Sequence, residues 1–228
     1  MSQPRVIAFV GTVGSGKSTH MKLLYSKLKK KGLKTKISCL KTGHLFAFIL
    51  EVLLARMVAD KRKDVFPIRA LVEEKPCLFR KIFKLWLNLD LISITVKFLA
   101  GVYFPLKLGC IVLVEEYIPA TISDYIYLGE IINFPLKRNS FAINYLLRLM
   151  NVCSPNQIIF LDAKNDKLKI RWKLRGSLDE REDYLHKQRT LLLQISRALS
   201  SNKLMYINTS SKTLTETQKL IMSHLLRG

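Results

Sequence analysis

Short apolar runs alternate along the chain with longer segments in which apolar residues recur at helical spacing. Runs of this length suit strands that are buried on both faces of a parallel sheet. Strands are predicted over residues 5–10, 34–40, 110–114, 157–161 and 204–207. Helices are predicted over residues 17–31, 44–60, 78–100 and 179–199. Further helices are predicted between the third strand and residue 150, with a break near Pro135, and a last helix that follows the fifth strand and ends at residue 226. The alternation predicts an α/β fold, with helices on both faces of a parallel sheet and one domain over residues 1–228.

The predicted helix over residues 78–100 is apolar nearly all round. Its apolar residues are interrupted by charges at Lys81, Lys84, Asp90 and Lys97. A membrane-spanning helix needs about 18 apolar residues, and no uncharged stretch of the chain reaches that length. We therefore expect no membrane span, but a long helix that packs on both sides or lies at the seam of a homodimer.

Composition and charge narrow the class of protein. Hydrophobic residues make up 49% of the chain and charged residues 24%, which excludes a disordered protein. The net charge of +21 favours an anionic partner, whether nucleotide, nucleic acid or an acidic surface, without choosing among them. The four cysteines are widely spaced, and no secretory segment precedes the first strand, so we expect a reducing, cytoplasmic location.

A complete Gly-x4-Gly-Lys-Ser motif lies between the first predicted strand and the first predicted helix. Glycines in this setting let backbone N–H groups converge on phosphate oxygens, and the helix N-terminus adds partial positive charge. Lys17 would reach the β- and γ-phosphates of ATP, and the Ser18 hydroxyl would bind Mg²⁺. The candidate ATP-binding residues are Gly11, Thr12, Val13, Gly14, Ser15, Gly16, Lys17, Ser18 and Thr19.

Two of the later strands end in carboxylates. Ligands of open α/β sheets bind beyond the carboxyl ends of the strands, where Glu115, Glu116 and Asp162 are expected. Glu115 is the candidate for holding Mg²⁺ through a water molecule. Because adjacent strand residues face opposite ways, we expect only one of Glu115 and Glu116 to face the site. Asp162 fits a helix cap as well as it fits a functional role.

A basic segment follows the fourth strand, and its cations share one helical face. The three- and four-residue spacing aligns Lys164, Lys167, Arg171 and Arg175. Arg171 and Arg175 could close over the phosphates as a lid, at about residues 164–177, and neutralise charge during phosphoryl transfer. A solvated basic helix is the alternative. Asp179 and Glu182 could hold such a lid by ion pairs, or begin the next helix.

In the order of its elements, nearly the whole chain resembles the thymidylate kinase-like group of nucleotide kinases. Members of that group carry Asp-Arg-Tyr/His at the end of a strand, where this chain has Glu115-Glu116-Tyr117, followed by a helix with Ser123 and Tyr125. The Arg171-x3-Arg175 pattern is similar to their lid. The resemblance implies a P-loop NTPase three-layer sandwich, with a five-stranded parallel sheet of order 2-3-1-4-5.

The same resemblance implies a reaction and an acceptor site. Such kinases transfer the γ-phosphoryl group of Mg-ATP to a nucleoside monophosphate, and dTMP is the first candidate. Catalytic roles are then expected for Lys17, Arg171, Arg175 and Glu115, and acceptor contacts for Lys41, Phe46, Tyr117 and Tyr125.

This chain departs from the family pattern at the acceptor end. Glu116 stands where the family has an arginine, Val13 replaces a carboxylate, and Lys41 begins a Lys-Thr-Gly-His turn in place of Arg-Glu-Pro-Gly. Two other functions therefore remain open. One is an ATPase acting on nucleic acid, with Glu115 and Glu116 as Walker B acids. The other is a catalytically degenerate, ATP-binding interaction protein.

Overall fold

The computed structural model describes residues 5–58, 67–137, 139–176 and 182–227. It contains a five-stranded, fully parallel sheet of order β2-β3-β1-β4-β5, which confirms the predicted topology. The strands are β1 (Val6–Gly11), β2 (Thr35–Cys39), β3 (Ile111–Glu115), β4 (Gln157–Asp162) and β5 (Leu204–Asn208). In the register, Cys39 lies opposite Glu115, Gly11 opposite Leu161, and Asp162 opposite Asn208. The carboxyl ends of the strands therefore form one edge, where the site is built.

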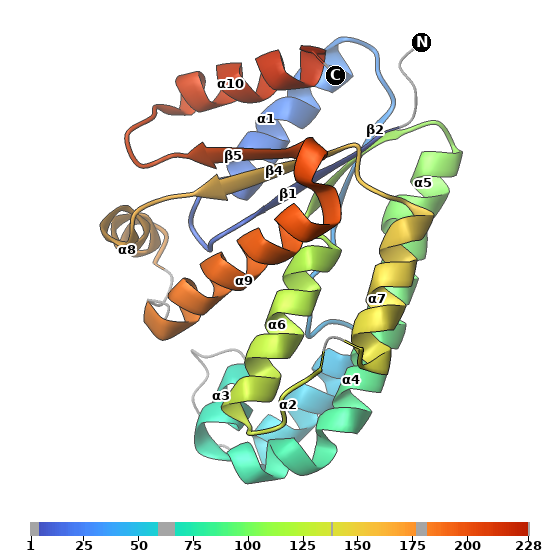
Figure 1. Cartoon of the computed structure of the whole chain (residues 1–228), viewed down its shortest axis with the longest axis vertical. Coiled ribbons are helices and arrows are strands. Elements are labelled where there is room, and N and C mark those ends of the chain that lie inside the picture. Colours follow the sequence, from blue (N-terminus) through green and yellow to red (C-terminus); the bar gives the residue numbers. More distant parts are fainter. Residues whose placement is uncertain (1–4, 59–66, 138, 177–181, 228) are drawn as a thin grey trace.

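Helices cover both faces of the sheet (Figure 1). The α-helices are α1 (Lys17–Lys30), α2 (Phe46–Val58), α3 (Pro67–Glu74), α4 (Pro76–Phe98), α5 (Phe104–Lys107), α6 (Ile118–Ile131), α7 (Phe141–Val152), α8 (Asn165–Leu174), α9 (Glu182–Ser200) and α10 (Leu214–Arg227). A π-helical turn, Leu99–Tyr103, joins α4 to α5, and a 3₁₀ turn, Ser201–Lys203, precedes β5. The predicted helix start at Asp179 lies outside the described residues.

The alternating side chains of β1 divide the core into two layers. Ile7 and Phe9 pack with Leu24 of α1 and Ile221 of α10 on one face. On the other face, Val6, Ala8 and Val10 join a larger cluster to which α4, α6, α7 and α9 contribute. Both faces of the central strand are therefore apolar, as its continuous run of hydrophobic residues predicts.

The long apolar helix extends further than the sequence predicts. It begins at Pro76 and continues through the π-helical turn to Lys107. Pro105 lies two residues after the end of this turn, and its nitrogen cannot donate a hydrogen bond. It passes so close to β2 that a Cβ on Gly101 would lie 2.2 Å from the Ser38 hydroxyl oxygen. By length and composition alone, Pro76–Lys107 could cross a membrane, and 39% of its most apolar window is buried in the protein.

Candidate nucleotide-binding site

The phosphate-loop motif forms the turn between β1 and α1, and its glycines are required by its geometry. Gly11 has φ +138°, and a Cβ there would lie 1.9 Å from the Leu161 carbonyl oxygen of β4. Gly14 has φ +84°, and a Cβ there would lie 2.6 Å from Trp172 Nε1. Only glycine combines these backbone angles with such close approach.

Lys17, in the first turn of α1, is buried inside the loop. Its Nζ donates to the carbonyl oxygens of Gly11 (2.9 Å) and Thr12 (3.0 Å) and pairs with the Glu116 carboxylate at 2.8 Å. These contacts fix the ammonium group above the backbone that would receive phosphate. Its charge is therefore positioned where a triphosphate would need neutralisation.

Ser18 and Glu115 supply two adjacent oxygen groups beside Lys17. The Ser18 hydroxyl donates a hydrogen bond to the Glu115 carboxylate at the end of β3. Hard oxygen ligands of this kind suit Mg²⁺, which binds through one or two protein groups together with substrate phosphates. No cluster of three or more His, Cys, Asp or Glu side chains occurs among the described residues, so phosphate oxygens would have to complete the ligand set. Bound there, Mg²⁺ would neutralise charge on the phosphates.

The expectation that Glu115 and Glu116 face opposite ways is wrong. Glu115 contacts Ser18, and Glu116 contacts Lys17, so both carboxylates reach the phosphate loop. The strand ends at Glu115, and Glu116 has φ +54°, a left-handed conformation that turns its side chain back toward the loop. Strand alternation therefore no longer applies at the second carboxylate.

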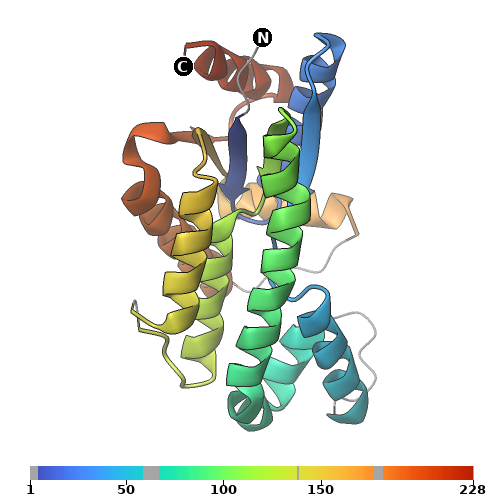
Figure 2. The same cartoon turned by 90° about the vertical axis from the view of Figure 1, so that its right-hand side faces the viewer.

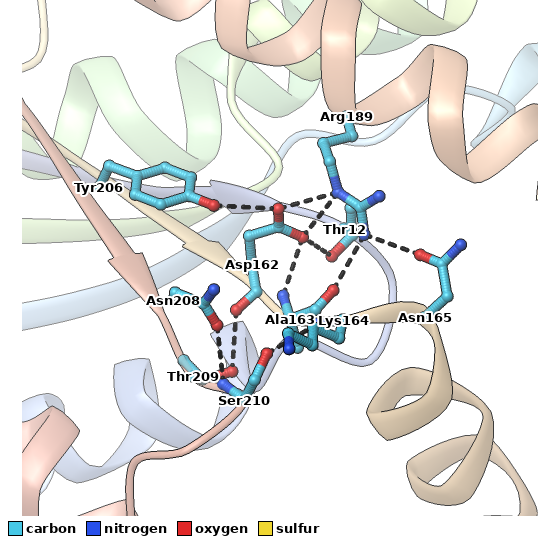
Figure 3. Close-up of polar contacts among 10 residues, drawn as sticks. All are labelled: Thr12, Asp162, Ala163, Lys164, Asn165, Arg189, Tyr206, Asn208, Thr209 and Ser210. Atoms are coloured by element: carbon cyan, nitrogen blue, oxygen red, sulfur yellow. Dashed lines mark hydrogen bonds and ion pairs between the residues drawn. The ribbon is translucent and has the colours of Figure 1, made fainter.

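Asp162, at the end of β4, is a buried carboxylate with several polar partners and does not cap the next helix (Figure 3). It accepts hydrogen bonds from the Thr12 hydroxyl (3.0 Å), the Ala163 amide (2.8 Å) and the Tyr206 hydroxyl (3.2 Å). It also forms an ion pair with Arg189 of α9 at 2.8 Å. The N-cap position of α8 is held by Lys164, without a side-chain hydrogen bond. Asp162 thus ties the phosphate loop to α9 and β5.

The basic segment forms α8, which docks against the phosphate loop. The Arg171 guanidinium donates to the Gly14 carbonyl (3.2 Å) and to both the hydroxyl and the carbonyl oxygen of Thr209 (3.0 Å each). Burial lowers the pKa of Arg171, and the neighbouring Arg175 lowers it further. Trp172 Nε1 donates to the Val13 carbonyl at 3.3 Å. The segment is therefore attached to the loop, and not merely a solvated helix.

A cavity of about 250 Å³ opens between the phosphate loop, α8 and the segment after β5. Its wall contains three cationic side chains, Arg171, Arg175 and Lys212, and no carboxylate. The lining residues are Gly14, Ser15, Gly16, Thr19, His20, Arg171, Arg175, Thr209, Lys212, Thr213, Leu214 and Thr217. This cavity is suited to an anionic ligand that enters beside the loop. A larger hollow of about 470 Å³, along α10, contains no phosphate-loop residue.

The acceptor residues expected from the sequence are not brought together. Lys41 is exposed just after β2, and Phe46 is 48% exposed at the start of α2. Tyr117 and Tyr125 are wholly buried, and their hydroxyls donate to the Cys153 carbonyl (2.7 Å) and the Asp90 carboxylate (2.8 Å). Lys41 and Tyr125 both interact electrostatically with the Asp124 carboxylate.

Two carboxylates instead hold the loop that follows β2, and a third, Glu51 of α2, accepts a hydrogen bond from Trp86 of α4. Asp124 accepts the Thr42 hydroxyl (2.8 Å), Asp90 accepts the Gly43 amide (2.9 Å), and Glu51 accepts Trp86 Nε1 (2.8 Å). Burial is the main cause that raises the pKa of Asp90 to about 6 and the pKa values of Glu51 and Asp124 to about 7.

Several residues of the site could not be found from sequence spacing. Arg189 donates to the Ala163 carbonyl (2.9 Å) and the Asn165 side chain (3.0 Å), in addition to its ion pair with Asp162. Thr209 lies in the predicted segment after the fifth strand, but its bonds with Arg171 depend on the packing of α8. The other expected lid carboxylate, Glu182, pairs with Lys169 at 2.6 Å on the surface, and Asp179 lies outside the described residues.

Comparison with known proteins identifies the fold of the chain. No protein family model and no curated protein sequence matches the chain. The solved thymidylate kinase from Candida albicans matches with a TM-score of 0.57 at 15% sequence identity, over 100% of this chain and 93% of that chain. The thymidylate kinase from Ehrlichia chaffeensis matches with a TM-score of 0.51 at 16% identity, over 100% of both chains. The chain therefore has the P-loop fold of the thymidylate kinases, as its phosphate loop and strand order indicate.

Proposed function

We propose that this protein transfers the γ-phosphoryl group of ATP to a nucleoside monophosphate, with dTMP as the first acceptor to test. The observation that carries the proposal is the phosphate loop, with Lys17 held at its centre and Arg171 docked on its rim. The thymidylate kinase fold supports the choice of acceptor class. We expect the reaction to take place in the cytoplasm, because all four cysteines are free thiols, as is usual in a reducing compartment.

In this reaction, a phosphate oxygen of the acceptor attacks the γ-phosphorus. The new O–P bond forms, the bond to the β–γ bridging oxygen breaks, and ADP leaves. Lys17 would exchange Glu116 for the β- and γ-phosphates, and Ser18 and Glu115 would hold Mg²⁺. Arg171 and Arg175 would neutralise the transferring group from the side of α8. Little covalent work is required of the protein, so positioning and charge account for the catalysis.

The residue proposed to contact the phosphate of the acceptor nucleotide is chosen by its charge and position. Lys41 would contact the acceptor phosphate, because it is the exposed cation at the end of β2 and interacts with Asp124. Glu116 occupies the position of the family's arginine, so Lys41 would have to supply the positive charge from a neighbouring strand.

The test is a screen of the common nucleosides and nucleoside monophosphates with ATP and Mg²⁺. ADP release and acceptor phosphorylation are measured together. Lys17→Ala should abolish ATP binding in calorimetry while the protein stays folded. Arg171→Ala should lower kcat by roughly 100-fold, as the loss of other electrostatic donors does, whereas the exposed Lys173→Ala on the same helix should not. Unchanged ATP affinity in Lys17→Ala would overturn the assigned site.

One observation favours a second candidate function, an ATPase that acts on nucleic acid. Glu115 and Glu116 both contact the phosphate loop, so Glu116 could orient an attacking water molecule while Glu115 serves the metal. Hydrolysis stimulated by DNA or RNA, with no acceptor phosphorylated, would replace the kinase proposal by this one. ATP binding without either reaction would leave a nucleotide-binding interaction protein.

A further inference from the structure

A concentration of positive charge lies at the end of α1 and the start of β2. Six of the ten residues from 27 to 36 are lysines, and the side chains of all six are exposed. The members of this group, called here the α1–β2 lysine cluster, are Lys27, Lys29, Lys30, Lys31, Lys34 and Lys36. Within the part of the chain that the structure describes, none of them forms an ion pair. The cluster is therefore an uncompensated cationic surface.

This cluster lies at the amino ends of the strands, opposite the edge that carries the phosphate loop. The Lys34 carbonyl accepts the Ile111 amide at 2.8 Å, where β3 begins beside β2. The helix α1 runs from Lys17 at the loop to Lys30, a distance of about 20 Å at 1.5 Å per residue. Figure 2 faces this end of the molecule, with α1 and β2 in blue at the upper right and α5 in green beside them. A nucleotide held in the phosphate loop would therefore lie far from the cluster.

The segments around the cluster contain no carboxylate. These acid-free segments are residues 22–38, 104–113, 150–161, 201–207 and 217–227, and they include the further exposed cations Lys107 and Lys203. The helix α10 packs against α1, but its carboxylate, Glu216, is in the first turn, at the phosphate-loop end. Glu115, Glu116 and Asp162 also lie at that end of the strands, and the other described carboxylates belong to α2, α3, α4, α6, α8 and α9. The two ends of the sheet therefore differ in the sign of their charge.

Local roles explain only part of this charge. Cations in the last turn of a helix interact favourably with its C-terminus, which accounts for Lys27, Lys29 and Lys30. A lysine on an edge strand hinders pairing with another chain, which accounts for Lys36 of β2. Neither role requires that acids be absent from the neighbouring segments. Because like charges in such number repel one another and destabilise the compact state, an anionic partner would stabilise this surface.

We propose that the α1–β2 lysine cluster binds the phosphate backbone of double-stranded nucleic acid without reading its sequence. Lysine presents a compact point charge on a flexible stem, which suits phosphates at varied positions. A DNA duplex carries one negative charge per about 1.7 Å of its axis, so several lysines can each meet a phosphate. The inference depends on the charge at this end of the sheet and not on the proposed reaction.

The other side chains of this surface favour a duplex over an acidic membrane or a single strand. Among residues 22–36, no large apolar side chain is exposed, and Leu28 and Leu33 pack into the core beneath α1. A membrane surface would need exposed apolar side chains to enter the acyl boundary. Single strands are bound by stacking of bases on aromatic rings, but Tyr25 packs into the same core, with Lys29 Nζ 5.8 Å from its ring centre. Phosphate contacts are the interaction that remains.

The test is fluorescence anisotropy of the full chain with labelled duplexes of about 20 base pairs, in salt between about 50 and 200 mM. DNA and RNA duplexes are measured in separate arms, each with two unrelated sequences, and binding in either arm supports the proposal. We expect the two sequences to bind equally well. The slope of log K against log salt should be about −4 or steeper, since each neutralised phosphate contributes about −0.9.

A pair of substitutions tests the cluster itself. Lys31→Gln with Lys34→Gln should make the salt slope shallower by about two units and weaken binding roughly tenfold or more at the lower salt concentrations. Both residues follow the last residue of α1, so the helix keeps its final turn. The matched control is Lys81→Gln with Lys137→Gln, which removes the same charge at exposed positions on α4 and after α6 and should change binding little. Circular dichroism checks that each variant is folded.

Any of four results would overturn the proposal. The duplexes would fail to bind even at the lowest salt, or the control pair would weaken binding as much as the cluster pair. An excess of Mg-ATP would displace the duplex, which would place the polyanion in the phosphate loop. Finally, vesicles that contain phosphatidylglycerol would bind the chain where duplexes do not, and the cluster would then belong to an acidic membrane surface.

Discussion

Asp90 offers a direct test of how the loop after β2 is held. Its carboxylate is wholly buried in α4 and accepts the Tyr125 hydroxyl (2.8 Å) and the Gly43 amide (2.9 Å). Burial raises its pKa from 3.8 to about 6, although these hydrogen bonds and the nearby Lys97 ammonium oppose the increase. The folded protein therefore binds this proton more tightly than the unfolded chain does.

The sign of the effect follows from that difference. Because the folded state holds more protons between pH 4 and pH 6, the contribution of Asp90 to the free energy of unfolding falls as pH rises through this window. A shift of about two pKa units corresponds to about 3 kcal/mol in total. Roughly half of that amount, about 1.4 kcal/mol, is still to be lost between pH 5 and pH 8.

Asp90→Asn removes the titration but keeps an oxygen that can accept one of the two hydrogen bonds. We expect the unfolding free energy of Asp90→Asn, relative to wild type, to increase by about 1.4 kcal/mol between pH 5 and pH 8. Urea unfolding of both proteins at each pH measures this difference, in which the titration of groups that do not interact with Asp90 cancels. Asn88→Ala, an exposed and uncharged site on the same helix, should give a difference that does not vary with pH. A flat or decreasing difference for Asp90→Asn would refute the reasoning.

Two further substitutions test the walls of the nucleotide site. Asp162→Asn should lower the unfolding free energy by about 3 kcal/mol, because it breaks the ion pair between a buried carboxylate and the partly buried Arg189. Tyr206→Phe, at a 46% exposed position, should cost about 1 kcal/mol or less in the same unfolding experiment. Gly14→Ala should weaken ATP binding in calorimetry, because its Cβ would lie 2.6 Å from Trp172 Nε1, and wild-type affinity would contradict the loop geometry. Gly32→Ala, also at positive φ but with open space around it, should cost about 1 kcal/mol of stability and leave ATP binding unchanged.

The sequence by itself determined the sheet and the phosphate loop, because both depend on local patterns. Continuous apolar runs mark strands that are buried on both faces, and the glycines of residues 11–16 mark a turn that other side chains would block. Lys17 and Ser18 follow at fixed positions in the first turn of a helix. The resemblance to thymidylate kinases in element order then gave the strand order that the structure shows.

Tertiary structure alone decided which distant side chains surround that loop. Glu116 reaches Lys17 because the backbone adopts φ +54° after β3, a conformation that no residue type at this position signals. Arg189 meets Asp162 because α9 packs beside β4, and no local pattern encodes that distance. Tyr117 and Tyr125 became core residues for the same reason, since burial depends on which helices cover them. Local spacing sets backbone geometry over a few residues, whereas the composition of a site depends on how whole elements pack.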